Sequence, residues 1–134
     1  MVKKLTLCIV DDDETSQYIL ARTVKSNNAV KSILVFSDGE PAFKFLTDNI
    51  GDEDKLPDVI FLDINMPIMN GWKFLDEFAI IRSKLKKSIT IYIVTSSSHS
   101  DDLEKAKHAN AVSDYLIKPV KQEVIEEIIG RLSA

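Results

Sequence analysis

The chain has 134 residues, a formal net charge of -4 at pH 7, 45% hydrophobic and 28% charged residues, and one cysteine. These proportions are typical of a single globular domain with a sizeable core, and we treat residues 1–134 as one domain. The negative charge argues against direct binding to nucleic acid. The lone Cys8 cannot form an internal disulfide, and the sequence shows neither a secretory signal nor a membrane span. We therefore expect a cytoplasmic protein that does not bind membranes.

Short apolar runs alternate with amphipathic stretches along the whole chain. Five runs have the length and composition of buried strands, at residues 5–10, 32–36, 59–62, 89–94 and 115–117. Five stretches have helical periodicity, at residues 15–26, 41–49, 72–81, 101–109 and 122–132. Strands that are apolar on both faces, each followed by a helix, predict a parallel sheet covered on both sides. The fold class is therefore a doubly wound α/β domain.

Polar side chains follow four of the predicted strands. The first strand is followed by Asp11 and Asp12, the third by Asp63, the fourth by Thr95 and the fifth by Lys118. Ligands of doubly wound sheets bind outside the carboxyl ends of the strands. If the first and third strands are neighbours, at a spacing of roughly 4.8 Å, their carboxylates converge within a few ångströms. We therefore expect a binding site at this edge of the sheet.

The residue types at this edge indicate phosphoryl chemistry. Carboxylates in such proximity repel one another unless a cation lies among them, and hard oxygen ligands with room for water suit Mg²⁺. Lys118 adds an ammonium group and Thr95 a hydroxyl that can bond a phosphoryl oxygen. In such a pocket, metal and ammonium neutralise the transferring group while a carboxylate attacks in line. Each residue alone also has a structural explanation, such as a helix start or a surface lysine, and only their combination favours a site.

Four motifs carry a resemblance to a known family. They are CIVDDDE, VIFLDINMPIMNG, IYIVTSSS and YLIKP, in this order. With them the sequence resembles a response-regulator receiver domain of bacterial two-component signalling, from about residue 4 to residue 132. The resemblance implies a five-stranded parallel sheet in the flavodoxin-like order 2-1-3-4-5, with helices on both faces. It also implies a phosphoprotein of a phosphorelay, not a turnover enzyme.

The resemblance assigns roles to the residues around the expected metal. Asp63 matches the phosphoacceptor, and Asp11 and Asp12 match the acidic pair that serves Mg²⁺. Asp12 and Asp63 would ligate the metal directly together with the backbone carbonyl of Asn65, and Asp11 would act mainly through water.

Further positions match residues that respond to the phosphoryl group. Thr95 and Tyr115 match the switch hydroxyl and the switch aromatic, and Lys118 matches the lysine that contacts the phosphoryl group. Lys118 precedes a proline whose peptide bond is usually cis in the family. Asn65 and Ser97 match positions that tune the lifetime of the acyl phosphate in the family.

The resemblance also implies partners. A sensor histidine kinase or a phosphotransfer protein would supply the phosphoryl group. Only 16 residues follow Lys118, so we expect no output domain and a signal that leaves through a downstream protein or by relay. The last predicted helix carries a broad apolar stripe that could support a homodimer beyond what the core needs. The stripe consists of Val124, Ile125, Ile128, Ile129 and Leu132.

Two further features of the sequence have structural interpretations. The basic RSKLKK stretch before the fourth strand is interpreted as a solvated connector, and His99 as a surface helix residue.

DDDET at residues 11–15 also fits the nucleophile motif of haloacid-dehalogenase-type phosphatases, in which Asp11 would be the covalent site. That family needs a further acidic cluster, whereas Glu123, Glu126 and Glu127 fall in a helical pattern. Flavin binding would need a phosphate cradle where three acids stand.

Overall fold

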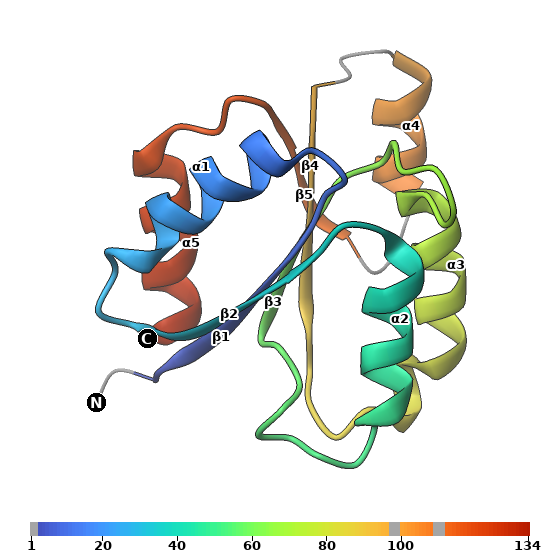
Figure 1. The fold of residues 1–134 in the computed structure, drawn as a ribbon, viewed down its shortest axis with the longest axis horizontal. Helices are drawn as coiled ribbons and strands as arrows, with labels where there is room; N and C mark the ends of the chain where they lie inside the picture. Colours follow the sequence, from blue (N-terminus) through green and yellow to red (C-terminus); the bar gives the residue numbers. More distant parts are fainter. Residues whose placement is uncertain (1–2, 97–99, 109–111) are drawn as a thin grey trace.

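A computed structural model describes residues 3–96, 100–108 and 112–134 (Figure 1). The strands are β1 (Leu5–Val10), β2 (Val30–Phe36), β3 (Val59–Leu62), β4 (Thr90–Thr95) and β5 (Val112–Ile117). The helices are α1 (Glu14–Lys25), α2 (Gly39–Asp48), α3 (Gly71–Ile81), α4 (Ser100–His108) and α5 (Gln122–Ser133), with a short 3₁₀ helix η1 (Arg82–Lys84) after α3. Among these helices, none is long and apolar enough to cross a bilayer.

The strands form one parallel sheet in the order β2-β1-β3-β4-β5, which confirms the predicted topology. The chain winds outward in one direction after β1 and in the other after β3, so the winding reverses beside these two strands. Val10 pairs with Leu62 at the last position of both strands. The residues that follow β1 and β3 therefore leave the sheet side by side.

Helices cover both faces of the sheet, with α1 and α5 on one face and α2, α3 and α4 on the other (Figure 1). Phe61 and Tyr92 stack at 6.0 Å between ring centroids on the α1/α5 face. Phe74 and Phe78 of α3 stack at 6.2 Å on the opposite face. Burial of each such side chain stabilises the fold by roughly 1.5–3 kcal/mol. Apolar side chains on both faces of the central strands thus form two cores around one sheet.

The apolar stripe of α5 belongs to the core on its face of the sheet. Ile125, Ile128 and Ile129 are buried there, and Val124 and Leu132 are partly buried against the same cluster. The stripe therefore packs against the sheet. Little of its apolar surface is left for the homodimer contact that the sequence suggested.

Two strands begin earlier than the sequence predicts. β2 starts at Val30 instead of residue 32, and β5 starts at Val112 instead of residue 115. Both are edge strands, and polar residues such as Ser113 and Asp114 are exposed within β5. Because an edge strand is covered less completely, it lacks the continuous apolar run by which a buried strand is found.

The predictions for Ser97 and His99 concern residues outside those that the structure describes.

The interpretation of the basic stretch after α3 as a solvated connector is wrong for Lys87, although Arg82, Lys84 and Lys86 are exposed. Arg82–Lys84 forms η1, and the side chain of Lys87 is only 12% exposed. Its ammonium group lies 3.4 Å from the carboxylate of Asp58 and donates a hydrogen bond to the carbonyl of Leu56 at 2.8 Å. Asp58 is 7% exposed and also accepts the N–H of Thr6 at 2.8 Å. Lys87 therefore binds groups at the amino edge of the sheet, which is the edge opposite the predicted site.

Replacement of Asp58 by Asn is expected to destabilise the fold at neutral pH by about 1 kcal/mol. Burial by itself would raise the pKa of Asp58, but the N–H of Thr6 and the ammonium groups of Lys3 and Lys87 outweigh it and lower this pKa. A lowered folded-state pKa means that the carboxylate stabilises the fold above its unfolded pKa, near 4, and that this contribution is lost as the pH falls through the folded value. In urea unfolding, the native chain should therefore be more stable than Asp58→Asn at pH 7, and the difference should shrink as the pH falls below about 4 toward the lowered folded-state pKa of Asp58. Equal stability at pH 7 would contradict this role.

Candidate functional site

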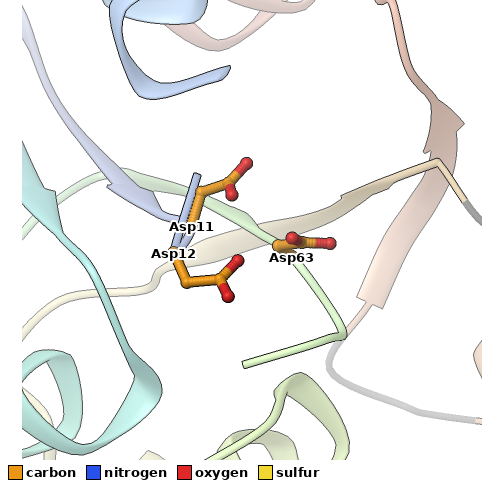
Figure 2. Close-up of side chains that lie close together, drawn as sticks. All are labelled: Asp11, Asp12 and Asp63. Atoms are coloured by element: carbon orange, nitrogen blue, oxygen red, sulfur yellow. The ribbon is translucent and has the colours of Figure 1, made fainter. Parts of the chain in front are cut away.

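Three carboxylates converge at the carboxyl edge of the sheet (Figure 2). Asp11 and Asp12 follow β1, Asp63 follows β3, and one oxygen of each lies within 4.8 Å of the others. Asp11 and Asp63 are 6% and 7% exposed, whereas Asp12 is exposed to solvent. The pairing of Val10 with Leu62 places these residues together, as the sequence predicts. Hard oxygen donors, two of them buried and one open to solvent, fit a divalent cation that keeps part of its water.

Backbone hydrogen bonds fix the two buried carboxylates. The N–H of Asp11 donates to the carbonyl of Phe36 at 3.0 Å, and the N–H of Asp63 donates to the carbonyl of Val10 at 2.8 Å. Each bond extends the ladder of the sheet by one residue. The carboxylate of Asp63 accepts the N–H of Ile64 at 2.8 Å. Asp11 and Asp63 are therefore held by the sheet itself, with little freedom to separate.

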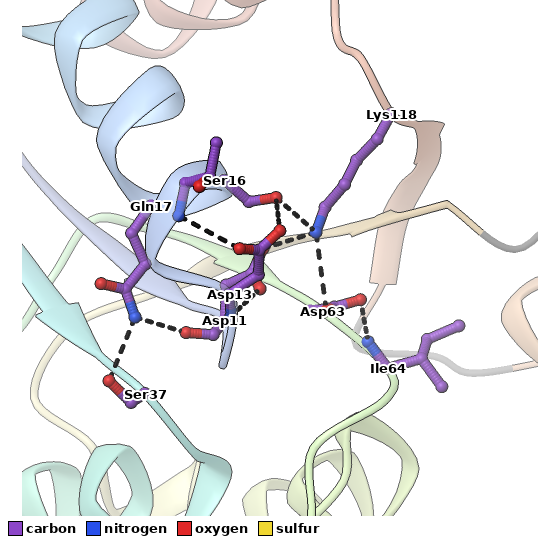
Figure 3. A network of polar contacts seen from close by, with 9 residues as sticks. Asp11, Asp13, Ser16, Gln17, Ser37, Asp63, Ile64 and Lys118 are labelled. Atoms are coloured by element: carbon purple, nitrogen blue, oxygen red, sulfur yellow. Dashed lines mark hydrogen bonds and ion pairs between the residues drawn. The ribbon is translucent and has the colours of Figure 1, made fainter.

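Lys118 reaches this edge from the end of β5 (Figure 3). Its ammonium group lies 2.6 Å from a carboxylate oxygen of Asp11 and 3.6 Å from one of Asp63. The same group donates to the hydroxyl of Ser16 at 3.3 Å, and this hydroxyl donates to Asp13 at 2.9 Å. The peptide bond between Lys118 and Pro119 is cis, as the resemblance implied. The first turn of α1 thus helps to hold the ammonium group beside the carboxylates.

The charged groups in the pocket affect one another's pKa values. Burial raises the pKa of Asp63 and the charge of Asp11 adds to this, while Lys118 and hydrogen bonds from Ile64 and Thr95 oppose it, and the net direction is upward. Burial would lower the pKa of Lys118, but its contacts with Asp11 and Asp63 outweigh burial and raise it. The pocket therefore keeps its ammonium group charged and holds a carboxylate that additional positive charge would stabilise.

The remaining predicted residues are placed on β4, on β5 and in the β3–α3 loop. Thr95 is the last residue of β4, is fully buried and hydrogen bonds to Asp63. Tyr115 lies on β5, where it pairs with Ile93, and is partly buried against the core beneath α2–α4. Asn65 is exposed in the loop after β3. The structure thus brings Thr95 to the carboxylates, while Tyr115 lies beside β4 and not within the acidic cluster.

Sequence reasoning missed residues that support the site. Asp13 caps α1 and bonds Ser16, which in turn contacts Lys118. Gln17 donates to the carbonyl of Asp11 at 2.6 Å and to the hydroxyl of Ser37 at 3.1 Å, joining the ends of β1 and β2. The third acid after the first strand signals a helix cap. The contact between Ser16 and Lys118 spans 102 residues and leaves no local signal.

Gly71, the first residue of α3, lets this helix approach the backbone of Asp63 closely. A Cβ at Gly71 would lie 2.5 Å from the carbonyl oxygen of Asp63 and 2.9 Å from the Cα of Ile64. Because these neighbours are backbone atoms, Gly71→Ala must displace α3 or the end of β3, and we expect a loss of about 2 kcal/mol in the free energy of unfolding. Gly130 in α5 has no atom within 4 Å of such a Cβ, so Gly130→Ala should gain about 0.5–1 kcal/mol. Urea unfolding of both variants checks the contrast, and a Gly71→Ala variant as stable as the native chain would contradict it.

Fold and site define an α/β domain with an acidic, metal-compatible pocket at the carboxyl edge of its sheet. Residues 7–130 match the model of the response regulator receiver domain, and the chain belongs to this family of phosphoacceptor signalling modules, which are not turnover enzymes. The matched residues include both Asp11 and Asp63. It favours the receiver over the phosphatase and flavin alternatives.

Relatives and solved structures agree with this assignment. Probable methanogenesis regulatory protein FilR2 of Methanothrix harundinacea is 28% identical over 94% of this chain and 79% of its own length. Protein-glutamate methylesterase/protein-glutamine glutaminase 3 of Geobacter sulfurreducens is 30% identical over 96% of this chain, which spans only 31% of that protein. A two-component response regulator from Cytophaga hutchinsonii has the same fold, with a TM-score of 0.82, 24% identity, and coverage of 97% of this chain and 98% of its own.

Proposed function

We propose that this chain accepts a phosphoryl group on Asp63 with Mg²⁺ bound, from the phosphohistidine of a sensor histidine kinase or phosphotransfer protein in the cytoplasm. The observation that carries the proposal is the convergence of three carboxylates with an ammonium group 3.6 Å from Asp63. Membership of the receiver family supports the same chemistry. That the 134 residues form a single receiver domain stays a prediction.

The transfer is a substitution at phosphorus. A carboxylate oxygen of Asp63 forms the new P–O bond while the P–N bond to the donor imidazole breaks, and the imidazole nitrogen keeps that electron pair and takes up a proton. The product is an acyl phosphate on Asp63. Lys118 lies where it can neutralise charge on the phosphoryl oxygens, and the hydroxyl of Thr95 can bond one of them.

Asp11, Asp12 and Asp63 are the residues that would hold Mg²⁺, together with the backbone carbonyl of Asn65. When bound, the metal supplies positive charge to the phosphoryl group during transfer. The ammonium group of Lys118 already balances Asp11 at 2.6 Å. Because this ammonium group lies near both Asp11 and Asp63, it can move toward the negative charge that a phosphoryl group would add at Asp63.

The signal would leave the pocket through Thr95 and Tyr115. Three phosphoryl oxygens on Asp63 offer new acceptors for the hydroxyl of Thr95, and movement of Thr95 changes the space available to Tyr115 on the adjacent strand. Phosphorylation then favours one of two arrangements of α4, β5 and α5 through these differential contacts. A downstream protein would read that surface, or the phosphoryl group would pass onward.

The proposal is tested by the intact mass of the chain after incubation with acetyl phosphate and Mg²⁺. The native chain should gain a single phosphoryl group, and chelation of the metal should prevent the gain. Asp63→Asn should show no adduct, and Asp11→Asn should form it more slowly because the metal site loses a carboxylate. Asp58→Asn is the matched control, because it makes the same chemical change at the opposite edge of the sheet and should keep the adduct. An adduct that persists in Asp63→Asn would overturn the proposal.

A further inference from the structure

A carboxylate from the β2–α2 junction holds the loop that follows Asp63. Asp38 caps α2, and one of its oxygens accepts the N–H of Glu40 at 3.1 Å and the N–H of Met69 at 2.8 Å. The other oxygen accepts the N–H of Ile68 at 3.0 Å. Asp38 is only 7% exposed, so these three donors largely replace water around its charge. A helix cap would need only the first of these bonds; the other two reach across 30 and 31 residues.

The backbones of the two segments also touch directly. The N–H of Gly39 donates to the carbonyl of Met69 at 3.2 Å, and a Cβ at Gly39 would lie 2.5 Å from that oxygen. The approach is possible because Gly39 carries no side chain. The start of α2 and the end of the β3–α3 loop therefore form one rigid junction.

This junction fixes the far end of the segment that carries Asn65. The near end is fixed at Ile64, whose N–H donates to Asp63 and whose carbonyl accepts the N–H of Gly71 at 2.8 Å. Met66 is buried between the two ends. We infer that Asp38 is a positioning residue, which holds the β3–α3 loop so that the carbonyl of Asn65 can join the three carboxylates around the metal. The inference rests on the proposed function and adds a residue that lies outside the acidic pocket.

The charge state of Asp38 suits this role. Burial by itself would raise the pKa of Asp38, but the N–H groups of Glu40, Ile68 and Met69 outweigh it and lower this pKa. The group is therefore a carboxylate at neutral pH, with both oxygens able to accept hydrogen bonds.

Two variants of Asp38 separate its cap from its contacts with the loop. Asp38→Ser keeps a hydroxyl that can cap α2, but this side chain is too short to reach Ile68 and Met69 as well. Asp38→Asn keeps one acceptor oxygen for Glu40 and Met69 and replaces the acceptor for Ile68 by a donor. Loss of a residue that orients metal ligands typically weakens metal binding 10–100-fold, so we expect the dissociation constant of Mg²⁺ to rise about tenfold in Asp38→Ser and by less in Asp38→Asn.

The measurement is calorimetric titration of the whole chain with Mg²⁺ alone, followed by the rate of phosphoryl uptake from acetyl phosphate at saturating Mg²⁺. A positioning role predicts weaker binding of Mg²⁺ with a rate that recovers toward the native value when the metal is saturating. Asp58→Asn is the control for simple loss of stability, because Asp58 is equally buried and also accepts a backbone N–H, but at the opposite edge of the sheet. It should lower stability and leave the affinity for Mg²⁺ unchanged.

The outcomes distinguish this inference from the proposed function. Unchanged affinity for Mg²⁺ in Asp38→Ser, or equal weakening in Asp58→Asn, would overturn the positioning role while the adduct on the native chain still supports phosphoryl transfer. A native chain that binds Mg²⁺ but gains no phosphoryl group would contradict the proposed function and leave the effect of Asp38 on metal affinity intact. A native chain without affinity for Mg²⁺ would overturn both.

Discussion

Asp63→Asn is expected to abolish phosphoryl uptake and, in the absence of metal, to raise the free energy of unfolding at neutral pH. The native carboxylate is buried within 4.8 Å of two other carboxylates, and burial with the charge of Asp11 makes its ionised form costly. The amide of Asn removes that charge and can still accept the N–H of Ile64. Lys118 keeps its closer contact with Asp11. We expect a gain of about 1 kcal/mol, in the range of stabilising substitutions at functional sites.

Urea unfolding at pH 7 with a chelator present measures this gain. Asp58→Asn provides the contrast, because the same chemical change at a carboxylate with two ammonium neighbours should destabilise the fold. Opposite signs for the two variants would show that the pocket holds unfavourable charge for the sake of its chemistry. A loss of stability in Asp63→Asn would mean that Lys118 and the hydrogen bonds already outweigh the repulsion.

Lys118→Met is expected to cause the largest loss of stability among substitutions in the pocket. The variant leaves Asp11 and Asp63 buried without the ammonium group that lies 2.6 Å and 3.6 Å away. Removing one partner of a buried ion pair typically costs 3–5 kcal/mol, and because Lys118 is still 20% exposed we expect about 3 kcal/mol. The rate of phosphoryl uptake should fall as well, since no ammonium group remains to neutralise the phosphoryl oxygens.

The effect of Lys118→Met should depend on Mg²⁺. The metal supplies positive charge to the same carboxylates, so Mg²⁺ should restore more stability to the variant than it adds to the native chain. Thermal unfolding with and without Mg²⁺ measures the difference. Lys73→Met is the control, because the pair of Lys73 with Glu77 lies on the surface and its loss should leave stability nearly unchanged. Equal effects of Mg²⁺ on native chain and Lys118→Met would contradict the account.

The convergence of acids, hydroxyl and lysine could be predicted because it follows from topology. In a parallel sheet every strand ends at the same edge, so Asp63 and Lys118 could be placed together without knowledge of any side-chain contact. The strand order followed from the family resemblance. The central strand β3 was predicted at its observed bounds because it is buried on both faces.

Contacts between distant segments could not be predicted in the same way. Asp38 caps α2 through a local bond with Glu40, but its bonds to Ile68 and Met69 depend on how α2 and α3 pack. Lys87 belonged to a basic run that indicated a solvated loop, and its contact with Asp58 forms only because the chain returns to the amino edge of the sheet before β4. Both involve charged groups satisfied by partners at least 29 residues away, which a periodic pattern does not encode.

The most direct test of the account is to find which residue carries the phosphoryl group. After incubation with acetyl phosphate and Mg²⁺, borohydride reduces an aspartyl phosphate to homoserine, and peptide mapping by mass spectrometry locates the reduced residue. We expect reduction at position 63 alone, and none when the metal is chelated. Reduction at position 11 or 12, or none in a chain that has gained a phosphoryl group, would show that the carboxylates at this edge serve a different chemistry.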